Sequence, residues 1–311
     1  MTTPMKEMKE KPTAILLATD LSGRCDRTQD RAIALARQWR ARLVAVTVVP
    51  GERERQVYDQ ILDPIPWANQ QTAAQLAEKR LRQGLAAADE DLAITLRVET
   101  GNIGDAVLRV AAEENCQLIV TGVARNEMFQ PVALGSTVSM LVRQAPQPVL
   151  IVHNRPRRPY YRLAMATDFS AAARNALEET VRLFDEPLTV ALIHGLDVPQ
   201  VGLTVMDANR GSLIDQAREA ASQQARKMLA EADIPAPIRD QITVVIEEGD
   251  PVRLLRDYLR DHESDLLAIG SKGRSALYDI LLGSTANRIL ELVQIDTLVV
   301  PAPAQQGKAP A

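Results

Sequence analysis

Three glycines and two hydroxyl residues near the C-terminal end have the types and spacing of an anion-binding loop. Gly270 and Gly273 are followed, after nine intervening residues, by Gly283, Ser284 and Thr285. Glycine lets the backbone approach an anion, and the N–H groups and hydroxyls at a helix start supply hydrogen-bond donors. An apolar run precedes Gly270 and a helical run starts at Thr285. The pattern therefore predicts a phosphate cradle between a strand and a helix.

Charged residues near this loop are further candidates. Lys272 and Arg274 flank Gly273 and could screen the charge of a phosphate. Asp168 follows an earlier apolar run, where a carboxylate can accept hydrogen bonds from ribose hydroxyls or an adenine amine. The alternative is purely structural: a glycine turn with a Ser/Thr helix cap, solvated loop cations, and an Asp168 that caps the helix after Thr167.

Continuous apolar runs alternate with helical patterns along the chain, as in parallel sheets whose strands are buried on both faces. The order β-α-β-α-β-α-β-α-β occurs twice, which predicts doubly wound sheets of the α/β class. Such sheets bind ligands at the carboxyl ends of their strands, where the strand order reverses. The expected strands are 14–18, 43–49, 93–98, 118–121 and 148–152, then 162–167, 188–195, 242–246, 266–269 and 297–300. The expected helices are 23–39, 68–88, 105–114 and 136–143, then 171–184, 212–232, 251–262 and 285–293.

The two halves of the chain are repeats of one another. Three separate motifs recur at the same offset of 148 residues, which is typical of a duplicated domain. Asp20 corresponds to Asp168, Gly122 to Gly270, and Gly135-Ser136-Thr137 to Gly283-Ser284-Thr285. We predict two tandem doubly wound α/β domains at 13–153 and 160–301, each with a five-stranded, mostly parallel sheet, joined by a Pro-rich linker.

The first domain departs from the pattern at one loop position. Gly122 is followed by Arg125 where the second glycine would stand, although Gly135, Ser136 and Thr137 are retained. The Cβ and long side chain of Arg125 prevent the backbone from approaching a phosphate closely. Arg125 therefore either blocks the pocket or acts as a side-chain phosphate donor. We favour impaired binding in this half. Gln117 replaces Asp265, which we interpret as a change at a solvated strand edge.

Composition excludes several classes of protein. The 311 residues are 46% hydrophobic and 24% charged, as in an ordinary globular chain, and the net charge of −4 argues against a nucleic-acid binder. No apolar run approaches the length of a membrane span, and the N-terminus lacks a signal-peptide core. Cys25 and Cys116 are too few for a disulfide framework, so we expect inert thiols and a cytoplasmic protein without membrane association.

Catalytic and metal-binding motifs are absent from the sequence. The three histidines are far apart and lack metal-ligand spacing, so no metal site from protein side chains is expected. We expect His194 to be structural at a strand end, with the pocket wall as the alternative. The chain contains no GxxxxGK[ST], GxGxxG, GxSxG or HExxH motif. No catalytic residue is assigned, and at most slow hydrolysis of a bound nucleotide is expected.

The arrangement resembles the universal stress protein family in its tandem two-domain form, over nearly the whole chain. Gly270, Gly273, Gly283 and Ser284 match the family's ATP-binding pattern of Gly, two residues, Gly, nine residues and Gly-Ser/Thr. The resemblance implies ATP as the ligand, with or without Mg²⁺. It also implies that Asp168 meets the nucleoside and that the backbone around Gly195 meets adenine. Glu248-Gly-Asp-Pro251 matches a sequence that often precedes the family's third helix.

Three functions remain open at this point. The first is an ATP-binding stress or regulatory protein that holds its nucleotide in the C-terminal domain. The second is a scaffold without nucleotide that acts through a regulatory protein partner. The third is an adenine-nucleotide enzyme such as an adenylyl transferase, whose usual additional motifs are missing. In the resembled family the apolar final strands pair between domains, which implies an intramolecular pseudo-dimer and leaves a homodimer of the whole chain open.

Overall fold

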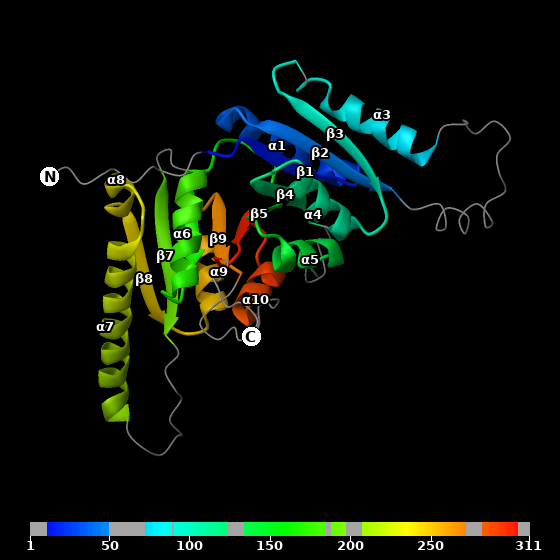
Figure 1. Cartoon of the computed structure of the whole chain (residues 1–311). Helices are drawn as coiled ribbons and strands as arrows, with labels where there is room; N and C mark the ends of the chain where they lie inside the picture. Colours follow the sequence, from blue (N-terminus) through cyan, green and yellow to red (C-terminus); the bar gives the residue numbers. More distant parts are fainter. Residues whose placement is uncertain are drawn as a thin grey trace, which may run out of the picture. The chain divides into compact units, whose positions relative to one another are not determined.

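Both halves of the chain fold as doubly wound α/β domains (Figure 1). The computed structural model describes residues 11–49, 72–88, 90–123, 134–184, 188–196, 207–271 and 282–303. The chain divides into two compact units with the boundary after Arg157. We call them the first and the second domain. The doubly wound α/β class predicted from the alternating patterns is confirmed, whereas the pairing of the two domains stays a prediction.

The first domain has a parallel sheet in the order β3-β2-β1-β4-β5. Its strands are β1 (Ala14–Ala18), β2 (Arg42–Val49), β3 (Ile94–Thr100), β4 (Leu118–Gly122) and β5 (Val149–Val152). Its helices are the 3-10 helix η1 (Gly23–Cys25), α1 (Asp26–Trp39), α3 (Ala73–Leu85), α4 (Ile103–Glu113) and α5 (Ser136–Gln144). The helix predicted over 23–39 is thus divided into η1 and α1.

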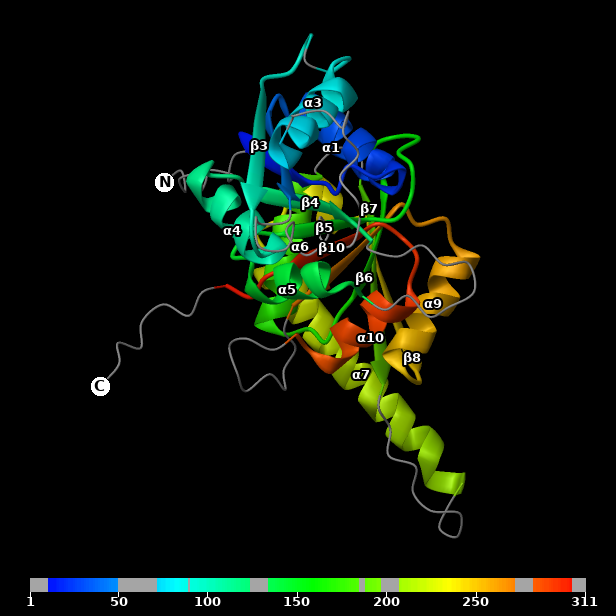
Figure 2. The same ribbon diagram turned by 90° about the vertical axis from the view of Figure 1, so that its right-hand side faces the viewer.

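The second domain repeats the topology in the order β8-β7-β6-β9-β10, again with parallel pairs. Its strands are β6 (Arg162–Ala166), β7 (Thr189–Leu196), β8 (Ile242–Glu248), β9 (Leu266–Gly270) and β10 (Thr297–Val300). Its helices are α6 (Ala171–Leu183), α7 (Asp207–Glu231), the short α8 (Ala236–Arg239), α9 (Pro251–Asp261) and α10 (Ser284–Leu292). Helices α9 and α10 pack together, as both views show (Figure 2).

The central strands form the core of each sheet because helices cover both faces. Residues Ile15, Leu16 and Leu17 of β1 are inaccessible to solvent, as are Leu266, Leu267 and Ala268 of β9. Unbroken apolar runs therefore become central strands, as expected for parallel sheets. None of the helices in the described part of the chain combines the length and apolar character that a bilayer crossing requires.

At the amino ends of the strands, one side chain in each domain joins the first strand to the fourth. Gln117 Oε1 accepts the backbone N–H groups of Thr13 and Ala14, at 3.1 and 3.0 Å. Asp265 Oδ2 accepts those of Tyr161 and Arg162, both at 3.0 Å. The interpretation of Gln117 as a merely solvated strand edge was therefore wrong. An amide oxygen replaces the carboxylate because both groups can accept two N–H donors.

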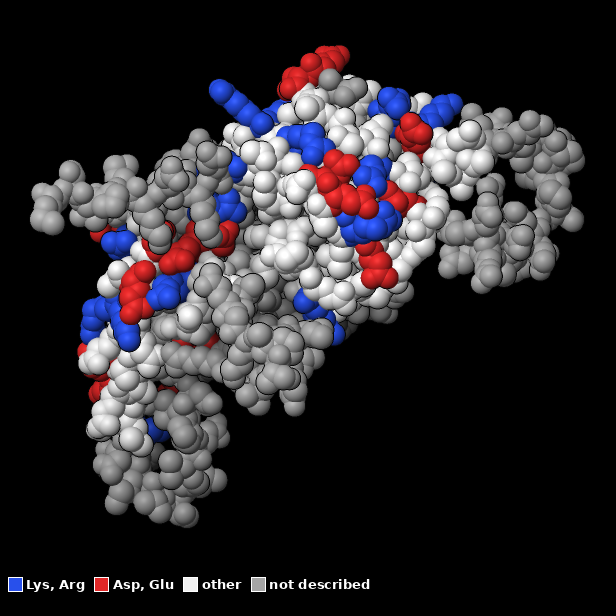
Figure 3. Space-filling model, viewed as in Figure 1, with Lys and Arg blue, Asp and Glu red and all other residues white. Residues whose placement is uncertain are grey.

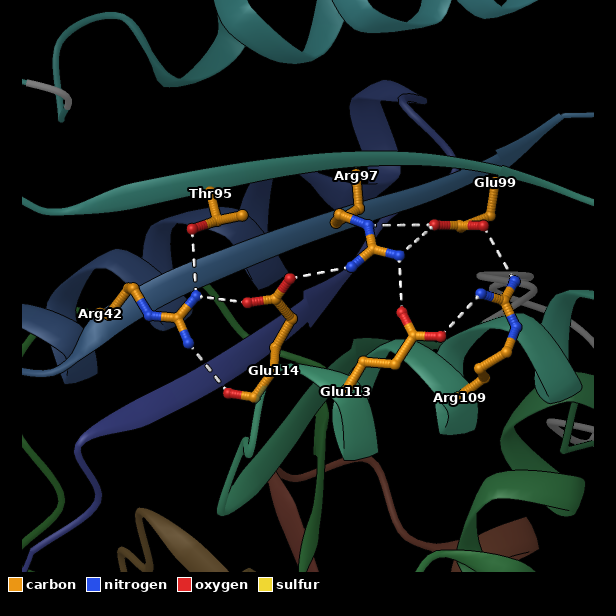
Figure 4. Close-up of polar contacts among 7 residues, drawn as sticks. All are labelled: Arg42, Thr95, Arg97, Glu99, Arg109, Glu113 and Glu114. Atoms are coloured by element: carbon orange, nitrogen blue, oxygen red, sulfur yellow. Dashed lines mark hydrogen bonds and ion pairs between the residues drawn. The ribbon is translucent and has the colours of Figure 1, made fainter.

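A continuous network of three arginines and three glutamates ties α4 to the strands of the first sheet (Figure 4). Arg97 lies at its centre and donates to Glu99, Glu113 and Glu114 at 2.7–3.1 Å. Arg109 joins Glu99 to Glu113, and Arg42 binds Glu114 at 2.7 Å. In Figure 3, opposite charges accordingly lie next to one another over α4. The network gives the β3 face a balanced charge.

Arg97→Met is expected to lower the midpoint of thermal unfolding at pH 7 by about 2–4 °C. Hydrogen bonds from Arg109 and Arg97 hold the pKa of Glu99 below its ordinary value, and those from Arg97 and Arg109 do so for Glu113. A carboxylate whose pKa is lowered in the folded state stabilises the fold at pH values above its ordinary pKa. This stability is lost as the pH falls through the folded-state pKa. The unfolding midpoints of wild type and Arg97→Met, measured from pH 7 to pH 3, should therefore converge as the pH falls. An equal difference at both pH values would contradict the network's role.

Candidate functional site

The site predicted in the second domain lies where the strand order reverses, between β6 and β9. Ligands of open α/β sheets bind at this point, outside the carboxyl ends of the strands. A cavity of about 270 Å³ is present there. It is lined by Ala166, Thr167, Asp168, Ala173, His194, Gly195, Pro251, Ile269, Gly270, Gly283, Ser284, Thr285, Ala286 and Ile289. Six residues proposed from the sequence are thus brought to one cavity, namely Asp168, Gly195, Gly270, Gly283, Ser284 and Thr285.

The turn after β6 holds Asp168 at the cavity wall. Asp168 Oδ1 accepts the N–H of Ser170 at 2.9 Å, and Thr167 Oγ1 accepts the N–H of Phe169 at 3.0 Å. Phe169 has a φ of 58°, an uncommon value for a bulky residue, which makes the turn sharp. The helix cap is Ser170, whose Oγ accepts the N–H of Ala173 at 3.2 Å. Asp168 is therefore not the cap of α6, and that alternative from the sequence is wrong.

Two hydroxyl residues at the start of α10 also line the cavity. The N-cap is Gly283, and among the described residues no side chain caps this helix. Ser284 and Thr285 follow it, line the cavity and are exposed. A helix N-terminus with uncapped N–H groups is suited to an anion. Residues 272–281 include Lys272, Gly273 and Arg274 and lie outside the described residues.

Gly195 is required by close backbone packing at the end of β7. A Cβ at this position would lie 2.6 Å from the carbonyl oxygen of Gly249 and 3.1 Å from Cα of Pro251. Both neighbours are backbone atoms of the turn that leads into α9, so they cannot rotate away. In the first domain, the strand register places Val48 at the corresponding position. In the second domain, the turn at Gly249 therefore packs closer to the end of β7 than it could if position 195 were a valine, as at Val48.

The pocket in the first domain borders two of the residues predicted there, Ser136 and Thr137. A pocket of about 360 Å³ is lined by Val48, Val49, Gly101, Asn102, Ile103, Gly104, Ser136, Thr137 and Met140. Neither Asp20 nor Gly122 borders it, and Gly135 is the N-cap of α5. Arg125, the residue on which the sequence interpretation relied, lies outside the described residues.

Two side chains of the η1–α1 segment contact the first-domain residues that correspond to Asp168 and Gly270. Cys25 Sγ donates to Asp20 Oδ1 at 3.0 Å, and the repeat places Ala173 at the corresponding position. Thr28 is buried, and its Oγ1 lies 2.6 Å from the position that a Cβ on Gly122 would take. Its counterpart is Ala176. An alignment of the two repeats over this helix would have shown the difference, because Cys25 aligns with Ala173 and Thr28 with Ala176.

The hydrogen bond between Asp20 and Cys25 favours an ionised carboxylate on Asp20 and a neutral thiol on Cys25. Burial opposes ionisation of Asp20, yet hydrogen bonds from Cys25 and Ser22 hold its pKa below the ordinary value. Burial, together with the hydrogen bond to Asp20, raises the pKa of Cys25. The thiol therefore remains a donor that occupies the carboxylate. Burial likewise raises the pKa of Cys116 to about 11, as expected for an inert thiol. In the described part of the chain, no cluster of three or more Cys, His, Asp or Glu residues could hold a metal ion.

Two tandem doubly wound domains, one with a glycine-bordered cavity at its switch point, place the chain in the doubly wound α/β class. The model of the Universal stress protein family matches residues 12–153 and 159–301. The chain therefore belongs to the universal stress protein family.

Individual relatives agree with this assignment. A universal stress protein of Methanocaldococcus jannaschii is 26% identical over 151 residues, which cover 47% of this chain and 85% of the relative. A crystal structure of a functionally unknown protein from Pseudomonas aeruginosa PAO1 superposes with a TM-score of 0.65 at 17% identity, covering 94% of this chain and 93% of the other. A universal stress protein from Archaeoglobus fulgidus gives a TM-score of 0.59 at 17% identity, covering 93% and 98%. These two structures establish similarity of fold alone.

Proposed function

We propose that this protein binds one adenine nucleotide per chain, in the cavity of the second domain. The observation that carries the proposal is the convergence of Asp168, Gly195, Gly270 and the α10 start on one cavity at the switch point. These residues come from four elements that are far apart in the sequence. Their chemistry suits a ligand with a polar sugar at one end and phosphates at the other.

Each wall of the cavity has a distinct part in this proposal. The Asp168 carboxylate accepts hydrogen bonds from ribose hydroxyls, because the turn around Phe169 holds it at the wall. Uncapped N–H groups and the hydroxyls of Ser284 and Thr285 donate to phosphate oxygens. On the sequence pattern alone, the proposal adds Lys272, Gly273 and Arg274 as further groups for the phosphates. The backbone at Gly195 meets the base.

The first domain does not hold a nucleotide in this proposal. Cys25 already donates to Asp20, and Thr28 packs against Gly122, so the groups that correspond to Asp168 and Gly270 are engaged within the domain. Arg125 adds a side chain at the loop glycine position. The prediction is therefore asymmetric, with one bound nucleotide for two related domains.

Nucleotide occupancy would act as a regulatory signal in a stress-tolerance role. A bound nucleotide shifts the population of any conformation for which its affinity is higher, and this can alter partner choice. Mg²⁺ would enter with the phosphates. A cytoplasmic location, a homodimer of the whole chain and a regulatory protein partner belong to the same proposal. The competing proposal is a scaffold that binds no nucleotide, and the contacts that Cys25 and Thr28 make with Asp20 and Gly122 support it for the first domain.

Gly273→Arg, which copies the first-domain loop, is expected to weaken ATP binding by at least about 100-fold because a side chain prevents close backbone approach. Isothermal titration calorimetry of the full chain with ATP and with AMP, each with and without Mg²⁺, measures this. Wild-type protein should bind one nucleotide per chain, and Arg125→Ala is the control that should keep this value.

Equal affinity of wild type and Gly273→Arg would overturn the placement of the nucleotide. Absence of binding by wild-type protein, with no nucleotide released from it in mass spectrometry, would favour the scaffold. Turnover of ATP well above slow hydrolysis would instead indicate an enzyme.

A further inference from the structure

A histidine on the cavity wall has its hydrogen-bonding role set by the backbone. His194 belongs to β7, is half-buried and lines the second-domain cavity beside Gly195. Its Nδ1 lies 2.8 Å from the carbonyl oxygen of Thr167. A carbonyl oxygen can only accept a hydrogen bond, so Nδ1 carries the proton. In the neutral ring Nε2 is then the acceptor, and among the described residues it has no hydrogen-bond partner.

Packing restricts the orientation of this ring. The ring centroids of His194 and Phe169 are 4.7 Å apart, with the planes tilted by 37°. Phe169 is itself buried at 8% exposure in the sharp turn that carries Asp168. Thr167, the hydrogen-bond partner, also lines the cavity. The ring of this cavity-lining residue is therefore held in place, on a wall that also includes Asp168.

The first domain has nothing comparable. The parallel register pairs Ala18 with Val46 and Ala166 with Ile193, so the residue that corresponds to His194 is Thr47. Thr47 is 3% exposed and does not border the first-domain pocket. The imidazole is thus present in the second domain and replaced by a threonine in the first, which forms the same sheet without it.

We propose that Nε2 of His194 is a specificity-determining acceptor for an N–H or O–H donor of a bound nucleoside. Two groups of an adenine nucleotide carry such a donor, the 6-amino group of the base and the ribose hydroxyls. A 6-oxo purine presents an acceptor in place of the amine, so its lone pair would face that of Nε2. A 2′-deoxyribose lacks one hydroxyl donor. The inference rests on the proposed nucleotide site and adds the residue that selects the ligand.

Two substitutions separate the acceptor from the structural role of the ring. In His194→Asn, the amide can still donate to Thr167 O but is too short to place an acceptor where Nε2 stands. In His194→Gln, the longer amide can place its oxygen near the Nε2 position. Thermal unfolding of both variants checks that the domain remains folded.

Calorimetric titration of the full chain at pH 8 with ATP, ITP and 2′-deoxy-ATP tests the inference. We expect His194→Asn to bind ATP about tenfold more weakly, as for one lost hydrogen bond, with partial recovery in His194→Gln. If the partner is the amine, the preference for ATP over ITP collapses in His194→Asn, and the preference over 2′-deoxy-ATP stays. If the partner is the 2′-hydroxyl, the opposite holds.

Unchanged ATP affinity and unchanged preferences in His194→Asn would overturn the role of His194, while loss of binding in Gly273→Arg would still uphold the nucleotide site. Wild-type protein that binds none of the three nucleotides would overturn both.

Discussion

Gly195→Val is expected to destabilise the second domain by about 1–3 kcal/mol, the usual cost of overpacking, and to weaken nucleotide binding by at least about 100-fold. The added Cβ would lie 2.6 Å from the carbonyl oxygen of Gly249, far inside contact distance. Gly249 has a φ of 139°, a conformation that glycine tolerates, so the turn has little room to adjust. The turn toward Pro251 must move, and Pro251 lines the cavity. Chemical denaturation and calorimetry with ATP measure the two effects.

A glycine in the same domain provides the matched control for this substitution. A Cβ added to Gly211 in α7 would meet nothing within 4 Å. Gly211→Ala should therefore leave ATP binding unchanged and stabilise the domain by about 0.5–1 kcal/mol through helix propensity. A Gly195→Val protein with wild-type stability and affinity would show that the β7 end and the turn before α9 are not tightly packed in solution.

Asp168→Asn is expected to weaken ATP binding by about 10- to 100-fold, as for loss of a charge-assisted hydrogen bond. The asparagine oxygen can still accept the N–H of Ser170, so the turn that includes Phe169 is retained. The change therefore removes the negative charge of the carboxylate while keeping the local fold. Calorimetry with ATP and thermal unfolding of the same sample separate affinity from stability.

The duplicated domain supplies the control for Asp168→Asn. Asp20 makes the corresponding turn, with its Oδ1 accepting the N–H of Ser22 at 2.9 Å, but it also accepts from Cys25. Asp20→Asn should leave both the ATP affinity and the value of one nucleotide per chain unchanged. Equal losses in the two variants would place a nucleotide in each domain and would contradict the asymmetry.

Much of the fold follows from patterns that are local in the sequence. Unbroken apolar runs such as Leu266–Ile269 can only be central strands of a covered sheet, and the helical segments between them require parallel connections. The duplication is visible without coordinates, because Asp20 and Asp168 stand at the same offset as Gly122 and Gly270. The short helix α8 was missed, and η1 was not separated from α1, because such short turns have too few residues to show a period.

The candidate site was predictable only in part. Asp168, Gly270 and Gly283 carry recognisable motifs, and the structure brings them to one cavity. Gln117 was misinterpreted because its role depends on two N–H groups of a strand more than a hundred residues away. Cys25 stood out only as a lone thiol, and its contact with Asp20 arises from the 3-10 turn between β1 and α1.

The sequence alone determined the doubly wound class, the duplication, the glycine loop and the contrast between Gly273 and Arg125, because these depend on residue type, period and order along the chain. The tertiary structure decided which side chains occupy each cavity. His194 faces a cavity while Thr47 is buried, and Cys25 fills the space that Ala173 leaves open. The reason is physical: strand register and helix position relative to the sheet set these contacts, and neither is a local property of the chain.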